Sequence, residues 1–192
     1  MSEVNNRPYV FVIVAPSGTG KSTLIKRLRN DFPELLWSVS YASRAPRPKE
    51  VEGVDYFFIS DLQFQQMIKE DAFIEWAIVH GEYKGTSKEF IRSHIEQKKP
   101  ILLDLDVQGA DAVKKSFPTQ SFIIFIEPPS IEILIQRLNK RGTESQQSID
   151  LRIKNAQLEL LRKNDYDILI KNDDIDKAHI KLQKILEEKI RS

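Results

Sequence analysis

The segment from Ala15 to Ser22 has the residue types and spacing with which proteins bind phosphate chains. It reads Ala-Pro-Ser-Gly-Thr-Gly-Lys-Ser and follows an apolar run, so a strand should lead through a glycine-rich loop into a helix. Successive backbone N–H groups and the N-terminal end of that helix would then face one anion. Lys21 would reach the β- and γ-phosphates, and the Ser22 hydroxyl would bind Mg²⁺. The sequence therefore predicts a nucleoside triphosphate site formed by Ala15, Pro16, Ser17, Gly18, Thr19, Gly20, Lys21, Ser22 and Thr23.

One position departs from the usual form of this motif. The pattern commonly begins with glycine, and this chain has Ala15 there. Alanine is tolerated if the backbone leaves the strand with a negative φ, because only a positive φ strongly favours glycine. We therefore expect an intact loop with its special backbone angles at Gly18 and Gly20. The alternative is a glycine-rich turn that only connects a strand to a helix, which the Gly-Lys-Ser-Thr at this point disfavours.

Composition limits the classes of partner. The 192 residues are enough for one compact domain, and 41% hydrophobic with 30% charged residues is ordinary for a globular protein. A net charge of +1 gives no overall basic field, so no nucleic-acid partner is expected. No apolar run approaches the roughly 20 residues that span a bilayer, so no membrane partner is expected. The absence of cysteine and of a signal-like segment predicts a cytoplasmic location.

Short apolar runs alternate with helical patterns, which is typical of an α/β fold with a mainly parallel sheet. The predicted core strands are residues 10–14, 101–105, 122–126 and 168–170. The predicted helices are residues 21–30, a helix capped by Ser130, and a last helix near residues 174–190. The sequence thus predicts a single domain whose P-loop core, a parallel sheet flanked by helices, comprises about residues 8–34, 99–138 and 153–192.

Two segments look like insertions into this core. Residues 35–98 mix aromatic residues, short strands at 54–59 and 73–79, and two helices, one of which begins with a capping box at Ser60. This segment is too long for a crossover helix alone, so it is predicted to be an inserted lobe. The polar stretch 139–152 contains Arg141 and Arg152, and a mobile loop that bears arginines near a phosphate site is typical of a lid.

The chain resembles the guanylate kinases from about residue 9 to residue 188. The resemblance is carried by many segments in one order, beyond the P-loop. They are Ser38-Val-Ser-Tyr-Ala-Ser-Arg44-Ala-Pro-Arg47-Pro, Gly53-Val-Asp-Tyr56-Phe-Phe, Phe73-Ile-Glu75-Trp, Gly85-Thr86-Ser87, Leu103-Asp104-Leu-Asp106-Val-Gln-Gly109, Pro128-Pro-Ser130, Arg141-Gly-Thr143 and Asn172-Asp-Asp174. The resemblance implies transfer of the γ-phosphoryl group of ATP to GMP, and dGMP as a further acceptor, with Mg²⁺. It also implies a P-loop core, a GMP-binding lobe and an arginine-bearing lid.

The resemblance implies roles for acceptor-site residues. Arg44 and Arg47 would grip the GMP phosphate through their planar guanidinium groups, although a single arginine there could equally belong to a solvated basic loop. Tyr56 would hydrogen-bond the same phosphate. Guanine presents two donors on one edge, N1–H and the 2-amino group, and carboxylates accept from both. The base contacts implied are Ser40, Glu75, Thr86 and Asp106, with a purely structural carboxylate as the alternative for Glu75.

The resemblance also implies metal and donor-site roles. Asp104 ends an apolar strand, where an acid would approach Mg²⁺, and Asp104 and Asp106 should project from the same face of an extended chain. The alternative is an aspartate that caps the following helix. Arg137, Arg141 and Arg152 would close over the ATP phosphates. Asn172 is placed near the adenine or in a turn. The implied catalytic cations are Lys21, Arg44, Arg141 and Arg152.

One residue departs from the family pattern in the acceptor site. The family commonly has two tyrosines before Gly-Thr, and this chain has Tyr83-Lys84. Either Lys84 points to solvent, or its ammonium replaces the missing hydroxyl at the GMP phosphate. The sequence leaves two alternatives to an ATP:GMP phosphotransferase: an inactive guanylate-kinase-like module that binds proteins, and a P-loop kinase for another acceptor. The cations and Asp104 favour the enzyme, and Glu75 with Asp106 favours guanine. The sequence does not predict the oligomeric state.

Overall fold

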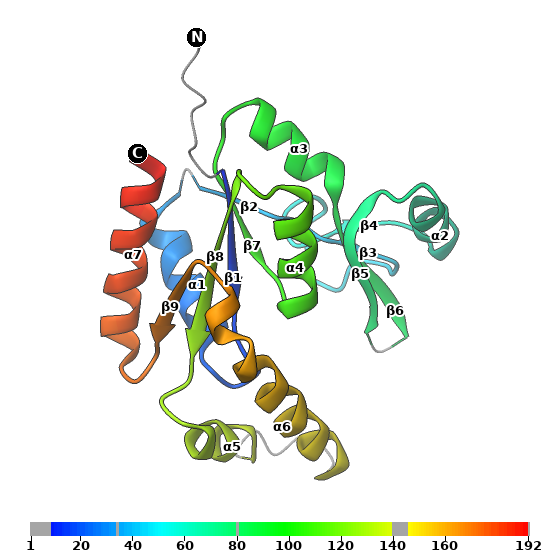
Figure 1. Ribbon diagram of the computed structural model, residues 1–192. Coiled ribbons are helices and arrows are strands. Elements are labelled where there is room, and N and C mark those ends of the chain that lie inside the picture. Colours follow the sequence, from blue (N-terminus) through cyan, green and yellow to red (C-terminus); the bar gives the residue numbers. More distant parts are fainter. Residues whose placement is uncertain (1–8, 34, 80, 140–145, 192) are drawn as a thin grey trace.

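A five-stranded parallel sheet forms the centre of the computed structural model, which describes residues 9–33, 35–79, 81–139 and 146–191. The strand order is β2-β7-β1-β8-β9 (Figure 1). The strands are β1 (Val10–Val14), β2 (Leu36–Trp37), β7 (Ile101–Asp104), β8 (Ser121–Glu127) and β9 (Ile168–Lys171). Parallel neighbours require crossover connections, which place helices on both faces of such a sheet. The predicted α/β fold with a parallel sheet flanked by helices is confirmed.

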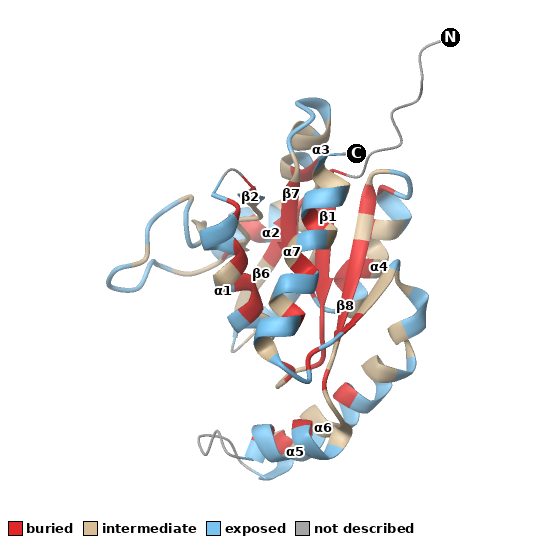
Figure 2. Cartoon of the chain, turned by 90° about the vertical axis from the view of Figure 1, so that its left-hand side faces the viewer, coloured by how far each residue is buried: buried red, intermediate tan, exposed pale blue. Residues whose placement is uncertain are grey.

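Alternate residues of β1 build the two halves of the core. Phe11 and Ile13 pack toward α1 (Lys21–Asp31) and α7 (Ile175–Arg191), and Val10, Val12 and Val14 pack on the opposite face. That opposite cluster contains residues of α3 (Lys88–Glu96) and α4 (Val107–Ser116). Figure 2 shows the buried central strands with α1 and α7 on the side toward the viewer. Burial on both faces explains why these strands are continuous apolar runs.

The register of the central strands brings chemically active segments to one edge. Ile13 of β1 lies opposite Asp104 of β7 and Ile124 of β8. The loop that follows β1 and the turn that follows β7 therefore leave the sheet side by side. Ligands of open parallel sheets bind beyond the carboxyl ends of the strands, so this edge is where a site is expected.

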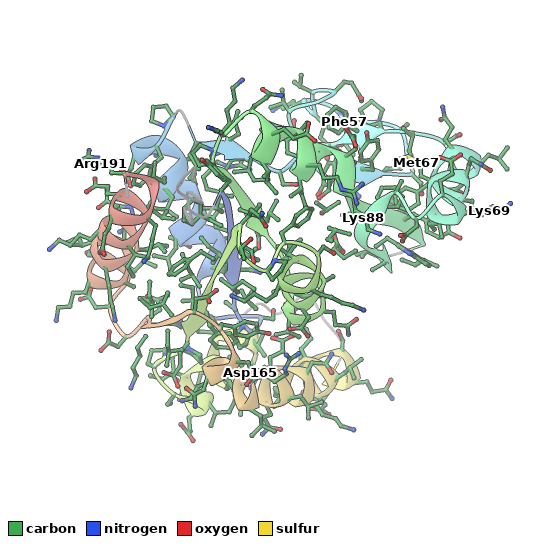
Figure 3. All side chains as sticks on the ribbon, turned by 45° about the horizontal axis from the view of Figure 1, so that its top comes forward. Phe57, Met67, Lys69, Lys88, Asp165 and Arg191 are labelled. Carbon is green, nitrogen blue, oxygen red and sulfur yellow. The ribbon has the colours of Figure 1, made fainter. Side chains whose placement is uncertain are left out.

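A second sheet of four strands lies beside the core (Figure 1), in the order β4-β3-β6-β5. Its strands are β3 (Tyr41–Ala42), β4 (Phe57–Phe58), β5 (Phe73–Val79) and β6 (Glu82–Ser87). Phe64 of α2 (Asp61–Lys69) stacks on Phe73 of β5 with 4.3 Å between the ring centroids. Met67 and Lys69 of α2 and Arg191 of α7 lie at opposite sides of the molecule (Figure 3). The assignment of residues 35–98 to a substrate-binding lobe remains a prediction.

Helices α5 (Ile131–Asn139) and α6 (Gln146–Leu161), followed by a 3₁₀ turn (Lys163–Asp165), lie at one end of the core (Figure 1). Residues 146–152 form the first turns of α6, so the expectation of a loop there is wrong. Ile149 and Ala156, seven residues apart on one helix face, are buried against Leu134 and Leu138 of α5. That apolar face is hard to recognise in the sequence, because the exposed leucines Leu151, Leu158 and Leu161 spread apolar residues around α6.

Other predicted elements are confirmed or corrected by the structure. Helices α1, α5 and α7 match the prediction to within two residues, and the capping box at Ser60 is present. The predicted strand 54–59 is wrong except for Phe57–Phe58, because Gly53 at φ +72° and a turn from Val51 to Asp55 occupy its start. No described helix is both long and apolar enough to cross a membrane.

Candidate active site

The P-loop has the backbone that its sequence predicts. Gly18 and Gly20 have φ values of +90° and +99°, whereas Ala15 is not among the described residues with a positive φ, and these expectations are confirmed. The hydroxyl of buried Thr19 donates to the Pro16 carbonyl at 2.7 Å and closes the loop. No side chain caps the N-terminus of α1, so its first N–H groups remain available to an anion.

Lys21 is held against the end of β7. Its ammonium lies 2.7 Å from Asp104 Oδ1 and donates to the Leu105 carbonyl at 2.8 Å. The Asp104 side chain is 46% exposed, so one carboxylate oxygen remains accessible to solvent or a ligand. The charge of Lys21 therefore stands beside the phosphate-binding loop before any nucleotide is bound.

The buried side chain of Asn172 holds the backbone of the P-loop. It is 3% exposed, and its Nδ2 donates to the Thr19 carbonyl at 2.7 Å. A Cβ at Gly20 would stand 2.7 Å from the same nitrogen, so glycine is needed there for space as well as for its φ. A cavity of about 520 Å³ adjoins this contact; it is lined by Gly18, Gly20, Thr23, Arg137, Asn172, Asp173 and Ile175. Asp173 and Ile175 were not predicted as site residues.

Two of the three predicted donor-site arginines contact the P-loop. Arg137 Nη1 donates to the Thr19 carbonyl at 3.3 Å and lies 3.4 Å from the Gly18 carbonyl. Arg152, from α6, donates to the Ser17 hydroxyl. Arg141 lies outside the described residues. The guanidinium groups of Arg137 from α5 and Arg152 from α6 thus both contact the P-loop.

Glu159 of α6 lines the cavity at the P-loop and was not predicted from the sequence. It lines a cavity of about 340 Å³ together with Asp106 and the P-loop residues Ala15, Pro16, Ser17, Gly18, Thr19, Gly20, Lys21, Ser22 and Thr23. Burial raises the pKa of Glu159, the nearby Lys21 charge opposes that rise, and Asp106 adds to it. No local pattern marks Glu159, because only the packing of α6 brings it to the loop.

A third cavity, of about 210 Å³, lies between the two sheets. It gathers the predicted residues Ser40, Tyr56, Thr86 and Asp104, and also Arg29, Ser38, Asp55 and Leu105, which were not predicted. Its walls come from segments on both sides of the lobe–core boundary. The turn that follows β7 therefore borders both this cavity and the phosphate-binding one.

The Glu75 and Asp106 carboxylates are held by different hydrogen bonds. Buried Thr86 donates its hydroxyl hydrogen to Glu75 Oε1 at 2.7 Å. Burial raises the pKa of Glu75, the Thr86 hydrogen bond opposes the rise, and the Asp106 charge adds to it. Asp106 is the N-cap of α4, and its Oδ1 accepts from the Gly109 N–H at 2.8 Å.

Asp104 and Asp106 alternate with Leu105 as the sequence predicts: the Asp106 backbone is extended, and both aspartates are exposed whereas Leu105 between them is buried. The strand β7 ends at Asp104, and α4 already begins at Val107, because Asp106 satisfies a free N–H group of its first turn. Asp106 therefore belongs to the helix start and Asp104 to the strand end.

Arg44 is buried in a cluster of carboxylates. Its side chain is 9% exposed and forms two hydrogen bonds with Glu50, at 2.6 and 2.8 Å, while its Nε lies 3.1 Å from Glu82. The Arg44 hydrogen bond, followed by that from the Arg47 backbone N–H, lowers the pKa of Glu50 to about 2. The Arg47 side chain is 67% exposed and reaches the edge of this cluster, where its Nη2 lies 4.0 Å from Glu82 Oε1.

Tyr56 brings two cations together. Its ring centroid lies 5.2 Å from the Arg44 guanidinium carbon and 5.1 Å from the Lys84 ammonium. Within the part of the chain that the structure describes, Lys84 forms no ion pair, in contrast to Arg44. Lys84 therefore contributes a positive charge that no carboxylate neutralises.

The comparisons agree on one family. A family model described as guanylate kinase matches residues 5–189. The guanylate kinase of Corynebacterium jeikeium (strain K411) is 42% identical over 188 residues, covering 97% of this chain and 100% of that protein. The guanylate kinase of Caldanaerobacter subterraneus subsp. tengcongensis is 44% identical over 183 residues, covering 95% of this chain and 88% of that protein. A crystal structure of guanylate kinase from Anaplasma phagocytophilum has a TM-score of 0.70 at 28% identity, covering 97% of this chain and 88% of that chain.

The support of the P-loop by Asn172 can be tested with Asn172→Ala. The substitution removes the shorter of the two hydrogen bonds to the Thr19 carbonyl and leaves only the 3.3 Å bond from Arg137, which costs about 0.5–1.5 kcal/mol. We expect weaker binding of a non-hydrolysable ATP analogue, measured by titration calorimetry. Lys171→Ala, at an exposed position of β9, is the matched control and should bind normally. Normal ATP affinity in Asn172→Ala would contradict this role.

Proposed function

Because this chain belongs to the guanylate kinase family and transfers the γ-phosphoryl group of ATP to GMP, we propose how its own residues hold the two nucleotides. The observation that carries the proposal is the position of the turn after β7. Asp104 and Leu105 line the cavity between the sheets, and Asp106 lines the cavity of the P-loop. We assign the P-loop cavity to the ATP phosphates. We assign the cavity between the sheets to GMP; the proposed base contacts Glu75 and Asp106 lie outside the lining of this cavity.

On the ATP side, the loop N–H groups and Lys21 bind the β- and γ-phosphates. When the phosphates enter, the Lys21 ammonium exchanges the Leu105 carbonyl and Asp104 for phosphate oxygens. Arg137 and Arg152 supply further positive charge from α5 and α6, and Arg141, outside the described residues, is assigned the same role. The cavity beside Asn172 receives the adenosine part.

The residues at the P-loop fit a magnesium ion. Ser22, at the exposed start of α1, and the accessible carboxylate of Asp104 provide the hard oxygen ligands that Mg²⁺ prefers. Among the described residues, no group of three or more acidic, histidine or cysteine side chains forms a self-contained metal site. Mg²⁺ commonly binds through one or two protein groups together with substrate phosphates, which matches this pair. When bound, the ion would neutralise negative charge on the phosphate oxygens.

On the GMP side, Glu75 and Asp106 accept hydrogen bonds from N1–H and the 2-amino group of guanine. Adenine has an unprotonated N1 and no 2-amino group, so it would leave both carboxylates unpaired. Ser40 is assigned to the guanine O6, and Thr86 acts partly by holding Glu75. None of these contacts involves the ribose 2′-hydroxyl, so dGMP is expected to be an acceptor as well.

The acceptor phosphate is assigned to Arg44, Arg47, Tyr56 and Lys84. A nucleotide phosphate has a second pKa of about 6 and is largely dianionic near neutral pH, so the attacking oxygen needs no general base. Catalysis then consists of alignment and neutralisation of charge by Lys21, Arg44, Arg141 and Arg152. An inactive protein-binding module would have no need for Lys21, Arg137 and Arg152 around a P-loop.

The charge role of Lys21 is tested with Lys21→Met. We expect kcat to fall by about 100-fold to 1,000-fold, since a preorganised charge at the transferring group is lost. The measurement is ADP formation with GMP in a coupled assay, with circular dichroism to verify the fold. Lys26→Met, on an exposed position of the same helix, should retain kcat. Turnover near the wild-type value in Lys21→Met would overturn the assignment.

The phosphate role of Lys84 is tested with Lys84→Ala and Lys84→Tyr. Hydrogen bonds with charged groups contribute about 1.5–3 kcal/mol, so Lys84→Ala should raise KM for GMP about tenfold or more at low salt. Added salt should narrow this difference, because ions screen the ammonium charge. Lys84→Tyr should remain active with a weaker dependence of KM on salt.

Lys69→Ala is the matched control, because it also removes a lysine charge, at an exposed position of α2. Its KM for GMP should equal that of the wild type at every salt concentration. An unchanged KM for GMP in Lys84→Ala at low salt would show that Arg44, Arg47 and Tyr56 hold the phosphate without Lys84.

A further inference from the structure

Gly109 occupies the first turn of α4, where a glycine is unfavourable. Glycine inside a helix destabilises it by roughly 0.5–1 kcal/mol relative to alanine. Gly109 is not among the described glycines with a positive φ, so its backbone conformation does not require glycine. The reason must therefore lie in the space around its Cα.

That space is filled by two neighbours. A Cβ at Gly109 would stand 3.1 Å from Leu105 Cβ and 3.2 Å from Glu75 Cγ. Both distances are shorter than the roughly 3.5–4.0 Å at which carbon atoms pack without repulsion. Leu105 Cβ is attached directly to the backbone, whereas Glu75 Cγ belongs to a flexible side chain. An added methyl group would therefore displace Glu75.

The same residue also fixes Asp106, because the Gly109 N–H donates to Asp106 Oδ1 at 2.8 Å. Glu75 comes from β5 of the second sheet, and Asp106 from the start of α4 in the core. The Gly109 N–H group binds the Asp106 carboxylate, and the absence of a side chain at Gly109 leaves room for Glu75.

We propose that Gly109 is a positioning residue that sets the spacing of Glu75 and Asp106 and thereby determines how well the site distinguishes guanine from other purines. This proposal rests on the proposed function, in which the two carboxylates read the guanine edge. Glu75 is held between the Thr86 hydroxyl on one side and the bare Cα of Gly109 on the other. Bulk at position 109 would move the carboxylate and strain its bond to Thr86.

The spacing matters most for a base that offers two donors. Guanine presents N1–H and the 2-amino group, whereas hypoxanthine, the base of IMP, presents N1–H alone. Two carboxylates at the correct separation can pair with both guanine donors at once, and a displaced Glu75 cannot. A change at Gly109 should therefore reduce kcat/KM for GMP more than kcat/KM for IMP.

The experiment measures kcat/KM for GMP and for IMP, with KM for ATP, in the wild type, Gly109→Ala, Glu75→Gln and the double variant. In Gly109→Ala we expect the GMP-to-IMP ratio to fall about tenfold, as small misplacements of binding groups commonly cause. KM for ATP should stay unchanged. Ser116→Ala, at an exposed position of the same helix, is the control for helix propensity and should keep the wild-type ratio.

The double variant shows whether Gly109 acts through Glu75. If it does, Gly109→Ala should have little further effect on the ratio once Glu75→Gln is present, because coupled residues are not additive. An unchanged ratio in Gly109→Ala, equal losses for GMP, IMP and ATP, or a variant unfolded by circular dichroism would each overturn the proposal. An unchanged kcat/KM for GMP in Glu75→Gln would instead overturn the assignment of Glu75 as a base contact.

Discussion

The turn from β7 into α4 constrains both halves of the site, because its three residues have partners in different directions. Asp104 and the Leu105 carbonyl hold the Lys21 ammonium at the P-loop, and Asp106 caps α4 through the Gly109 N–H. The parallel register of β1 and β7 places this turn next to the phosphate loop. The P-loop cavity and the cavity between the sheets therefore both border this short segment of the core. Reactants aligned across such a segment lose little further freedom when they react.

Most of the positive groups in the site are held by partners before a substrate binds. Lys21 is paired with Asp104, Arg44 with Glu50, and Arg152 with the Ser17 hydroxyl. Such partners keep the cations oriented, which lowers the cost of organising charge around the transferring phosphoryl group. Lys84 differs, since its ammonium lies over the Tyr56 ring without a carboxylate. Its charge is thus the one most directly available to an incoming phosphate.

The core strands and the P-loop could be predicted because local patterns determine them. Continuous apolar runs mark β1, β7 and β8, and Gly18 and Gly20 stand where the backbone requires a positive φ. The two-residue strands β2 and β3 are too short to leave a periodic pattern. β6 was missed because Lys84 and Gly85 interrupt its alternation, although pairing with β5 and β3 stabilises it.

The site was predictable only in part. Residue spacing alone indicated the P-loop site, whereas the roles of Glu75, Asp106 and the arginines came from the resemblance and remain proposals. Glu159 reaches the phosphate cavity through the packing of α6, and Gly109 contacts Glu75 through the approach of two distant elements. Such tertiary contacts leave no signal in the local sequence. The alternation of Asp104 and Asp106 on an extended backbone was predictable, whereas the role of Asp106 as N-cap of α4 was not predicted.

The most direct test of this account is the choice of acceptor. ADP formation should be measured with GMP, dGMP, AMP, CMP and UMP under identical conditions, with ATP and Mg²⁺ in excess. The account predicts turnover with GMP and dGMP, and a kcat/KM for AMP at least about 10⁴-fold lower, since adenine would leave both the half-buried Glu75 and the exposed Asp106 without a donor. A kcat/KM for AMP within tenfold of that for GMP would contradict the claim that Glu75 and Asp106 select guanine.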